Sequence, residues 1–295
     1  MNCPNCNNNI PDGSKFCNHC GQRIEIISGV KHCSNPQCGK EIPSDSMFCP
    51  FCGAKLDYAS QNGVFLQSKL SFEVNGVSFN MMRVNRGSFM MGSTEETCDE
   101  RPVHEVTITK DYYIGETQVT QKLWESVMRN NPSCCIGDDL PVETVSWEDC
   151  QDFIKKLNDI TGKNFRLPTE AEWEFAARGG TKSNGYRYSG SDKIDDVAWH
   201  CNNSEFRTHP VMTKKSNELG IYDMSGNVLE WCQDFYGFYA DYKLTNPKGP
   251  DCGNCHVIRG GSVITHASHS TPSRRKPMNP VARLFDIGLR LVLPQ

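Results

Sequence analysis

Two tandem sets of four cysteines lie within the first 52 residues and restrict what this part of the chain can fold into. Half of the sixteen cysteines of the 295-residue chain are found there. The segment Ile10–Cys17 recurs as Ile42–Cys49, an offset of 32 positions, so the two sets form an internal repeat. Each unit of about twenty residues is too short to bury a core of its own. Bonds between the cysteines, or from the cysteines to a metal, must therefore hold it together.

The cysteine spacing favours metal ions. The first set is Cys3, Cys6, Cys17 and Cys20, and the second is Cys33, Cys38, Cys49 and Cys52. Four thiolates complete a tetrahedral Zn²⁺ site, and cysteines two residues apart can turn around one ion. Gly21 and Gly53 suit the tight turns that close the units. We predict two structural Zn²⁺ ions, in zinc ribbons over residues 1–24 and 31–56; disulfides in an exported mini-domain are the alternative. The pair resembles the double zinc ribbons that mediate protein contacts in many bacterial and archaeal proteins.

Charge and hydropathy argue against several partners. The net charge is −4 at pH 7, and residues 1–57 hold five basic and five acidic side chains. Nucleic-acid binding needs clustered cations, so we expect no nucleic-acid partner. No apolar run approaches the ~20 residues of a membrane span, and the N-terminus lacks the pattern of a signal peptide. We expect no membrane association and a cytoplasmic location.

The sequence pattern changes near Ser71. The preceding stretch, residues 57–70, is rich in small polar residues and is predicted as a linker. Apolar and β-branched residues alternate on both sides of Asn75-Gly76, which predicts a β-hairpin. We assign residues 71–295 to one large domain.

Three helices are predicted in the large domain. Ser146 is a typical N-cap for the first, whose apolar residues recur on one face. Thr169 and Glu172 form a capping box for the second, which Gly179-Gly180 should end. Residues 120–128 are the third. After Gly180 the helical period is lost, so we expect loops and short strands.

Five motifs follow one another in the large domain. They are Asp99–His104, Pro141–Trp147, Arg166–Arg178, Gly220–Trp231 and Arg259–Ser262. In this order they resemble the formylglycine-generating-enzyme (sulfatase-modifying factor) family over about residues 80–295. The resemblance implies an α+β, C-type-lectin-like fold with little regular secondary structure. It also implies that residues 263–287 lie near a ligand face, on a frame built by the buried motifs.

The resemblance implies a calcium site in the fourth motif. Carried over position by position, Asp223 and Glu230 would bind through their carboxylates, and Gly226 and Val228 through their backbone oxygens. Hard oxygen ligands on an irregular loop suit Ca²⁺. The alternative is a loop held by internal hydrogen bonds.

The family's oxidation chemistry depends on two thiolates that hold Cu(I) in the C-terminal segment. In this chain those positions fall at about Thr265 and Ser270, and no cysteine lies between Ser262 and Gly288. A neutral hydroxyl is a weak ligand for Cu(I). We therefore expect no copper and no catalytic residues of the family type. An oxidoreductase of the family type with an altered metal centre is the alternative function.

Other metal arrangements stay open. His266 and His269 could bind a transition metal together with Cys252, Cys255 or His256. The segment Cys252–His256 also matches the string that attaches c-type haem. Ordinary surface side chains are the competing interpretation.

A non-catalytic binding protein is the function we predict. Varied side chains on a rigid frame can present a ligand surface at residues 263–287. The predicted contact residues are Val263, Ile264, Thr265, His266, Ser268, His269, Thr271, Arg274 and Phe285. The arrangement resembles the variable proteins of diversity-generating retroelements, whose ligand face mutates at adenine codons. The ligand is a protein or another molecule of unknown identity, and the ribbons are expected to contact a protein partner. A third interpretation makes the large domain an adaptor for a cytosolic complex that the ribbons recruit.

Overall fold

The structure is a computed structural model that describes residues 30–33, 35, 38–43, 48–53, 67–95 and 97–295. The chain divides into two units, Met1–Leu66 and Gln67–Gln295. Among the described residues, no helix is both long enough and apolar enough to cross a membrane.

The described part of the first unit is a small hairpin that carries cysteines. Strand β1 (Val30–His32) pairs antiparallel with β2 (Glu41–Pro43), and the amide of Cys33 donates to the carbonyl of Lys40 at 2.9 Å. Gly53 has a φ of 71°, as expected for a turn that closes the unit. The first predicted zinc set (Cys3, Cys6, Cys17 and Cys20) and linker residues 57–66 lie outside the described residues.

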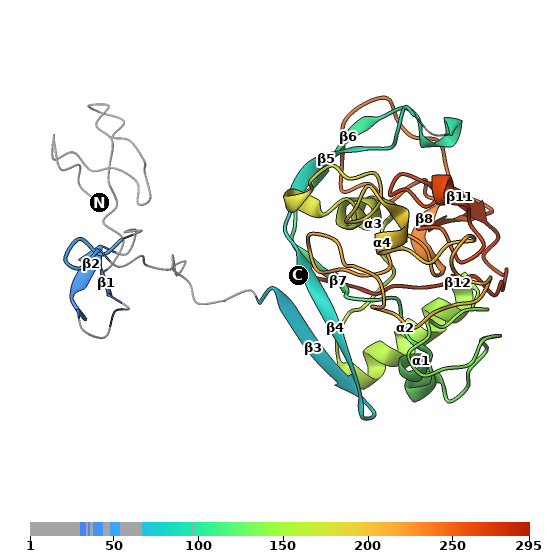
Figure 1. Ribbon diagram of the computed structural model, residues 1–295, viewed down its shortest axis with the longest axis horizontal. Coiled ribbons are helices and arrows are strands. Elements are labelled where there is room, and N and C mark those ends of the chain that lie inside the picture. Colours follow the sequence, from blue (N-terminus) through green and yellow to red (C-terminus); the bar gives the residue numbers. More distant parts are fainter. Residues whose placement is uncertain (1–29, 34, 36–37, 44–47, 54–66, 96) are drawn as a thin grey trace. The chain divides into compact units, whose positions relative to one another are not determined.

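The large domain begins with the predicted hairpin. Strands β3 (Lys69–Val74) and β4 (Val77–Val84) pair antiparallel, and Asn75 and Gly76 turn between them with φ angles of 49° and 80°. β3 starts at Lys69, inside the stretch predicted as linker. Figure 1 shows the hairpin along one side of the domain, with its turn near α1; there Asn75 donates to the carbonyl of Ser126 at 2.8 Å.

Three sheets build the rest of the domain. The other strands are β5 (Gly87–Met91), β6 (His104–Ile108), β7 (Tyr112–Gly115), β8 (Leu229–Phe235), β9 (Leu244–Thr245), β10 (His256–Arg259), β11 (Arg275–Met278), β12 (Ile287–Gly288) and β13 (Val292–Pro294). The strand orders are β13-β7-β4-β3, β5-β6-β9 and β11-β10-β8-β12. Because β12 pairs with β8 and β13 pairs with β7, the last residues tie two sheets together.

The three predicted helices are confirmed. They are α1 (Gln121–Met128), α2 (Trp147–Thr161) and α3 (Glu170–Ala177), and a short α4 (Ile194–Val197) follows. Thr120 caps α1, and Ser146 and Thr169 form full capping boxes at α2 and α3. Three 3₁₀ turns lie at Cys98–Glu100, Gly180–Lys182 and Ala267–His269.

Irregular backbone fills the second half of the domain, as the resemblance implied. Residues 198–228 contain neither helix nor strand. One core lies around α1 and α2, where the rings of Trp124 and Phe153 stack at 4.9 Å. A second core surrounds α3, all eight residues of which are buried. This α+β arrangement with few helices confirms the expected fold class.

Candidate functional site

A buried arginine positions the front of the 263–287 segment. The Arg259 side chain is fully enclosed, at 0% exposure, and donates to the Glu174 carboxylate at 2.6 Å. The same guanidinium donates to the carbonyls of Pro272 at 2.7 Å and Arg274 at 3.2 Å. Arg178 and Arg259 hold the pKa of Glu174 below its usual range, against the opposite effect of burial. The Arg259–Ser262 motif thus fixes the position of backbone within the segment.

A second buried arginine fixes the end of the segment. The Arg290 guanidinium contacts the Glu230 carboxylate twice, at 2.7 and 2.9 Å, and neither side chain is exposed. It also donates to the carbonyls of Gly115 and Tyr222, both at 2.9 Å. In a domain with little regular structure, such bonds replace helix and sheet ladders as the means of positioning loops.

Six of the nine predicted contact residues reach the surface. Ile264, His266 and Phe285 are exposed, and Ser268, His269 and Arg274 are half-buried. Arg274 forms ion pairs with Asp99 at 3.5 Å and Glu100 at 3.3 Å. It therefore anchors the segment to the first family motif.

The other three predicted contacts are corrected by the structure. Val263, Thr265 and Thr271 are 0%, 7% and 4% exposed, so they cannot touch a ligand in this conformation. Thr265 Oγ1 accepts from the backbone amide of Ser262 at 3.0 Å, and Ser262 Oγ donates to Asp286 at 2.7 Å. These side chains hold the segment in place from inside.

The segment exposes two large apolar side chains besides the predicted contact residues. Val281 and Leu284 are 55% and 42% exposed, beside Ile264 at 43% and Phe285 at 39%. Leu284 is tied to the body of the domain, because the amide of Thr144 donates to its carbonyl at 3.0 Å. Four large apolar side chains of this anchored segment are therefore open to solvent.

The two positions that would carry thiolates in an oxidase have structural roles here. Thr265 belongs to the hydrogen-bonded turn with Ser262. Ser270 is fully buried, and a Cβ added to Gly261 would lie 2.5 Å from Ser270 Oγ. Both hydroxyl side chains are thus packed into the frame.

The oxygens predicted to bind calcium do converge, but on an amide of the chain. Gln118 Nε2 lies 3.2 Å from the carbonyl of Asp223, 3.3 Å from that of Gly226 and 2.9 Å from that of Val228. It lies 3.0 Å from Glu230 Oε1. Asp223 thus faces the centre with its backbone oxygen, whereas its carboxylate was predicted to do so. We call these four oxygens the oxygen cage.

The Asp223 carboxylate points elsewhere. Its Oδ2 accepts from the backbone amide of Met212 at 3.0 Å. Burial raises the pKa of Asp223 to about 6. This carboxyl therefore stabilises the backbone turn at Met212.

The haem-attachment interpretation of Cys252–His256 does not fit the structure. The His256 ring is 4% exposed and lies between Trp147, at 4.0 Å, and Phe235, at 4.3 Å. Its Nδ1 is 3.1 Å from the carbonyl of Gln233. Burial lowers the pKa of His256. The enclosed ring is part of the core.

The second predicted zinc set is assembled. The sulfurs of Cys33, Cys38, Cys49 and Cys52 all lie within 4.8 Å of one another. Two of the sulfur–sulfur distances are 3.6 and 3.7 Å. Tetrahedral thiolates at ~2.3 Å from one Zn²⁺ are about 3.8 Å apart, so the donor set fits this ion.

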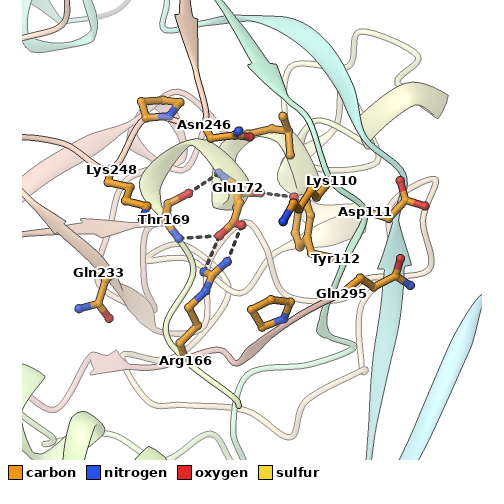
Figure 2. A pocket seen from close by; sticks show the side chains of 13 residues that line it. Lys110, Asp111, Tyr112, Arg166, Thr169, Glu172, Gln233, Asn246, Lys248 and Gln295 are labelled. Atoms are coloured by element: carbon orange, nitrogen blue, oxygen red, sulfur yellow. Dashed lines mark hydrogen bonds and ion pairs between the residues drawn. The ribbon is translucent and has the colours of Figure 1, made fainter. Parts of the chain in front are cut away.

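Two cavities lie in the large domain, and the smaller of them is lined in part by Arg275 of the 263–287 segment. One, of about 400 Å³, has the Arg166–Glu172 pair in its wall (Figure 2), with N–O distances of 2.6 and 2.7 Å. Because Glu172 also completes the capping box of α3, this pair serves the fold.

The other cavity, of about 290 Å³, is lined by Asp234, Glu170 and Tyr239, among others. Burial raises the pKa of Asp234 to about 8, and the adjacent Glu170 adds to the effect. These surroundings favour the protonated form of Asp234 in the folded state.

Comparison with known families agrees with this architecture. The sulfatase-modifying factor enzyme 1-like domain matches residues 71–294, and the double zinc ribbon matches residues 3–53. The chain therefore belongs to the formylglycine-generating-enzyme (sulfatase-modifying factor) family, with a double zinc ribbon ahead of the family domain.

The relatives of this chain include a chaperone protein and a formylglycine-generating enzyme. Chaperone protein LppX of Paenibacillus barcinonensis is 33% identical over 232 residues, which cover 62% of this chain and 80% of that protein. The formylglycine-generating enzyme of Streptomyces coelicolor is 35% identical over 169 residues. That match covers 51% of each protein, so the chain spans about half of the enzyme's length.

Two solved structures resemble the large domain. Treponema denticola variable protein 1 superposes with a TM-score of 0.73 at 31% identity, covering 78% of this chain and 100% of that chain. PvdO from Pseudomonas aeruginosa superposes with a TM-score of 0.63 at 26% identity, covering 73% and 94%. The scaffold is thus shared with an enzyme family and with a variable protein.

Proposed function

We propose that the large domain is a non-catalytic binding protein whose ligand surface lies within residues 263–287. The observation that carries this proposal is the set of exposed apolar side chains at Ile264, Val281, Leu284 and Phe285. They belong to a segment whose two ends are locked by buried arginines. Exposed apolar side chains of this kind favour a protein partner.

Similarity to a variable protein supports a further part of this proposal. Treponema denticola variable protein 1 aligns over its entire length with this chain. We therefore propose that the 263–287 segment is diversified by a retroelement. His266, Ser268 and His269 then provide polar contacts around the apolar side chains.

Capture experiments with matched variants test the surface. The wild-type chain and an Ile264→Ser/Phe285→Ser double variant are used as bait in an extract of the source cells. Ile160→Ser is the control, because Ile160 is 49% exposed but lies on α2, outside the segment. The proposal expects a partner that binds the wild type and the control and is lost with the double variant. A partner retained by the double variant would contradict it.

We propose two structural Zn²⁺ ions in the ribbons, one held by the Cys33–Cys52 set and one by the Cys3–Cys20 set. Thiolate clusters of this kind persist in reducing compartments, which favours a cytoplasmic location. Metal analysis of the full chain should give two zinc ions, and Cys49→Ser should remove one. All five tryptophans lie between residues 124 and 231, so their fluorescence should not change.

The ribbons are proposed to contact a partner protein. If the large domain is instead an adaptor for a cytosolic complex that the ribbons recruit, deletion of residues 1–56 should abolish partner capture without unfolding the large domain. Capture that survives this deletion assigns the contact to the large domain.

An oxidoreductase with an altered metal centre is the alternative function, which the similarity to the Streptomyces enzyme favours. Copper loading and an assay on a cysteine-containing sulfatase-type peptide distinguish the two. Stoichiometric copper with thiol oxidation would establish the oxidoreductase, and the absence of both would remove it.

A further inference from the structure

The oxygen cage gathers acceptors around a single nitrogen. Three carbonyls and one carboxylate oxygen lie 2.9–3.3 Å from Gln118 Nε2. Gln118 is 1% exposed, so its side chain is shielded from bulk solvent. In proteins, a bound Ca²⁺ ion is surrounded by oxygen ligands at about 2.3–2.6 Å. It could enter only if the amide left.

The geometry also decides which way the Gln118 amide points. With Oε1 in the cage, five oxygens would face one another without a proton or cation between them. With Nε2 there, two N–H groups are shared among four acceptors. Gln118 Oε1 then remains buried without a hydrogen-bond partner in the described structure. One unpaired acceptor is a smaller cost than five oxygens that repel one another.

Glu230 has no acceptor position left for a metal. Its Oε1 accepts from Arg290 at 2.7 Å and from Gln118 at 3.0 Å. Its Oε2 accepts from Arg290 at 2.9 Å and from Trp173 Nε1 at 2.6 Å. A carboxylate offers about four acceptor sites, and all four are used. Its charge is balanced by Arg290, a permanent cation of the chain.

We propose that the Gln118 amide is the built-in occupant of the oxygen cage, so that the large domain holds the frame of its ligand segment without calcium. The amide supplies donors to the loop, and Arg290 supplies the positive charge. Because Arg290 also ends the 263–287 segment, the same network positions the ligand surface. This proposal is independent of which ligand binds.

Calcium titration of the full, zinc-loaded chain tests the proposal. Thermal unfolding is followed by tryptophan fluorescence, which reports only the large domain. We expect millimolar calcium to shift the wild-type Tm by less than about 1 °C, as for a ligand without a site on the folded state. Terbium is the second probe, because Trp173 touches Glu230 and would sensitise its emission from the cage. A calcium-dependent rise in the wild-type Tm, or stoichiometric terbium emission, would overturn the proposal.

Two variants test whether a change at Gln118 creates a calcium response that the wild type lacks. Gln118→Glu replaces the donor by a carboxylate, so the cage should then require a cation. Its Tm should fall without calcium and recover by roughly 5 °C or more when calcium is added. Gln121→Glu is the matched control, because Gln121 is also 1% exposed and donates to the carbonyls of Cys135 and Pro141. The proposal would be contradicted if calcium shifted the Tm of both variants equally, or if it did not shift the Tm of Gln118→Glu.

Discussion

The frame motifs and the segment between them use their side chains in opposite ways. Arg259, Glu230 and Arg290 are fully buried, and each forms charged hydrogen bonds that join distant parts of the chain. Within the segment, Ile264 and Phe285 are 43% and 39% exposed. This difference indicates that the buried residues of the frame motifs stabilise this region. Outward side chains of the segment can therefore change without loss of the fold.

Breaking the frame should have the largest effect. Arg290→Met leaves the buried Glu230 carboxylate without its counter-ion and should lower the free energy of unfolding by about 3–5 kcal/mol. The control is Arg283→Met, which removes a surface pair with Asp149 whose side chains are 50% and 29% exposed. Its cost should be much smaller, because an exposed ion pair is screened by solvent. Urea denaturation read by tryptophan fluorescence measures both, and equal losses would contradict the comparison.

The protonated Asp234 beside the frame should make stability depend on pH. Its folded pKa is raised from 3.8 to about 8 by burial, then by Glu170 and Glu172, with Arg259 opposing. The folded state therefore keeps a proton that the unfolded state has released, so stability is lost as pH rises from about 4 to 8.

Asp234→Asn should remove most of this slope. Between about pH 5 and 8, the wild type should lose roughly 2–4 kcal/mol and the variant much less. Denaturation curves at the two pH values provide the measurement. Asp138→Asn is the control, because its side chain is 74% exposed and should leave the slope unchanged. A slope that survives in Asp234→Asn would show that another group carries it.

Two neighbouring residues of the segment, Val263 and Ile264, should differ in their contribution to stability. Val263 is 0% exposed, and Val263→Ala should cost about 1–3 kcal/mol through lost burial and a cavity. Ile264→Ala should change stability by no more than about 0.5 kcal/mol, because Ile264 faces outward. Chemical denaturation distinguishes the two. A larger loss for Ile264→Ala than for Val263→Ala would mean that the assignment of buried and displayed side chains is wrong.

Local signals in the sequence predicted much of this fold. The Asn75-Gly76 hairpin and the helices that start after Thr120, Ser146 and Thr169 depend on residues close together in the chain. The cysteine spacing likewise predicted the Cys33–Cys52 cluster. Such features follow from backbone preferences and short-range hydrogen bonds, which a single sequence displays.

Features that depend on distant residues could not be predicted in the same way. Gln118 meets its cage partners across 105–112 positions, and nothing around it in the sequence marks an amide that faces four oxygens. Within the segment, the backbone is irregular, so neither a helical nor a strand period tells Val263 from Ile264. The contact set was therefore too broad by Val263, Thr265 and Thr271. Asp234 gives no local signal either, because its burial comes from α3 and β10.

Comparison of the 3′ ends of this gene between near-identical isolates tests the central claim most directly. A fixed frame with an exchangeable ligand surface predicts differences concentrated between residues 263 and 287, with Ile264, His266 and Phe285 among the changed positions. The frame residues Gln118, Glu230, Arg259 and Arg290 should stay constant. Differences scattered evenly over the large domain, or a constant 263–287 segment, would contradict the account.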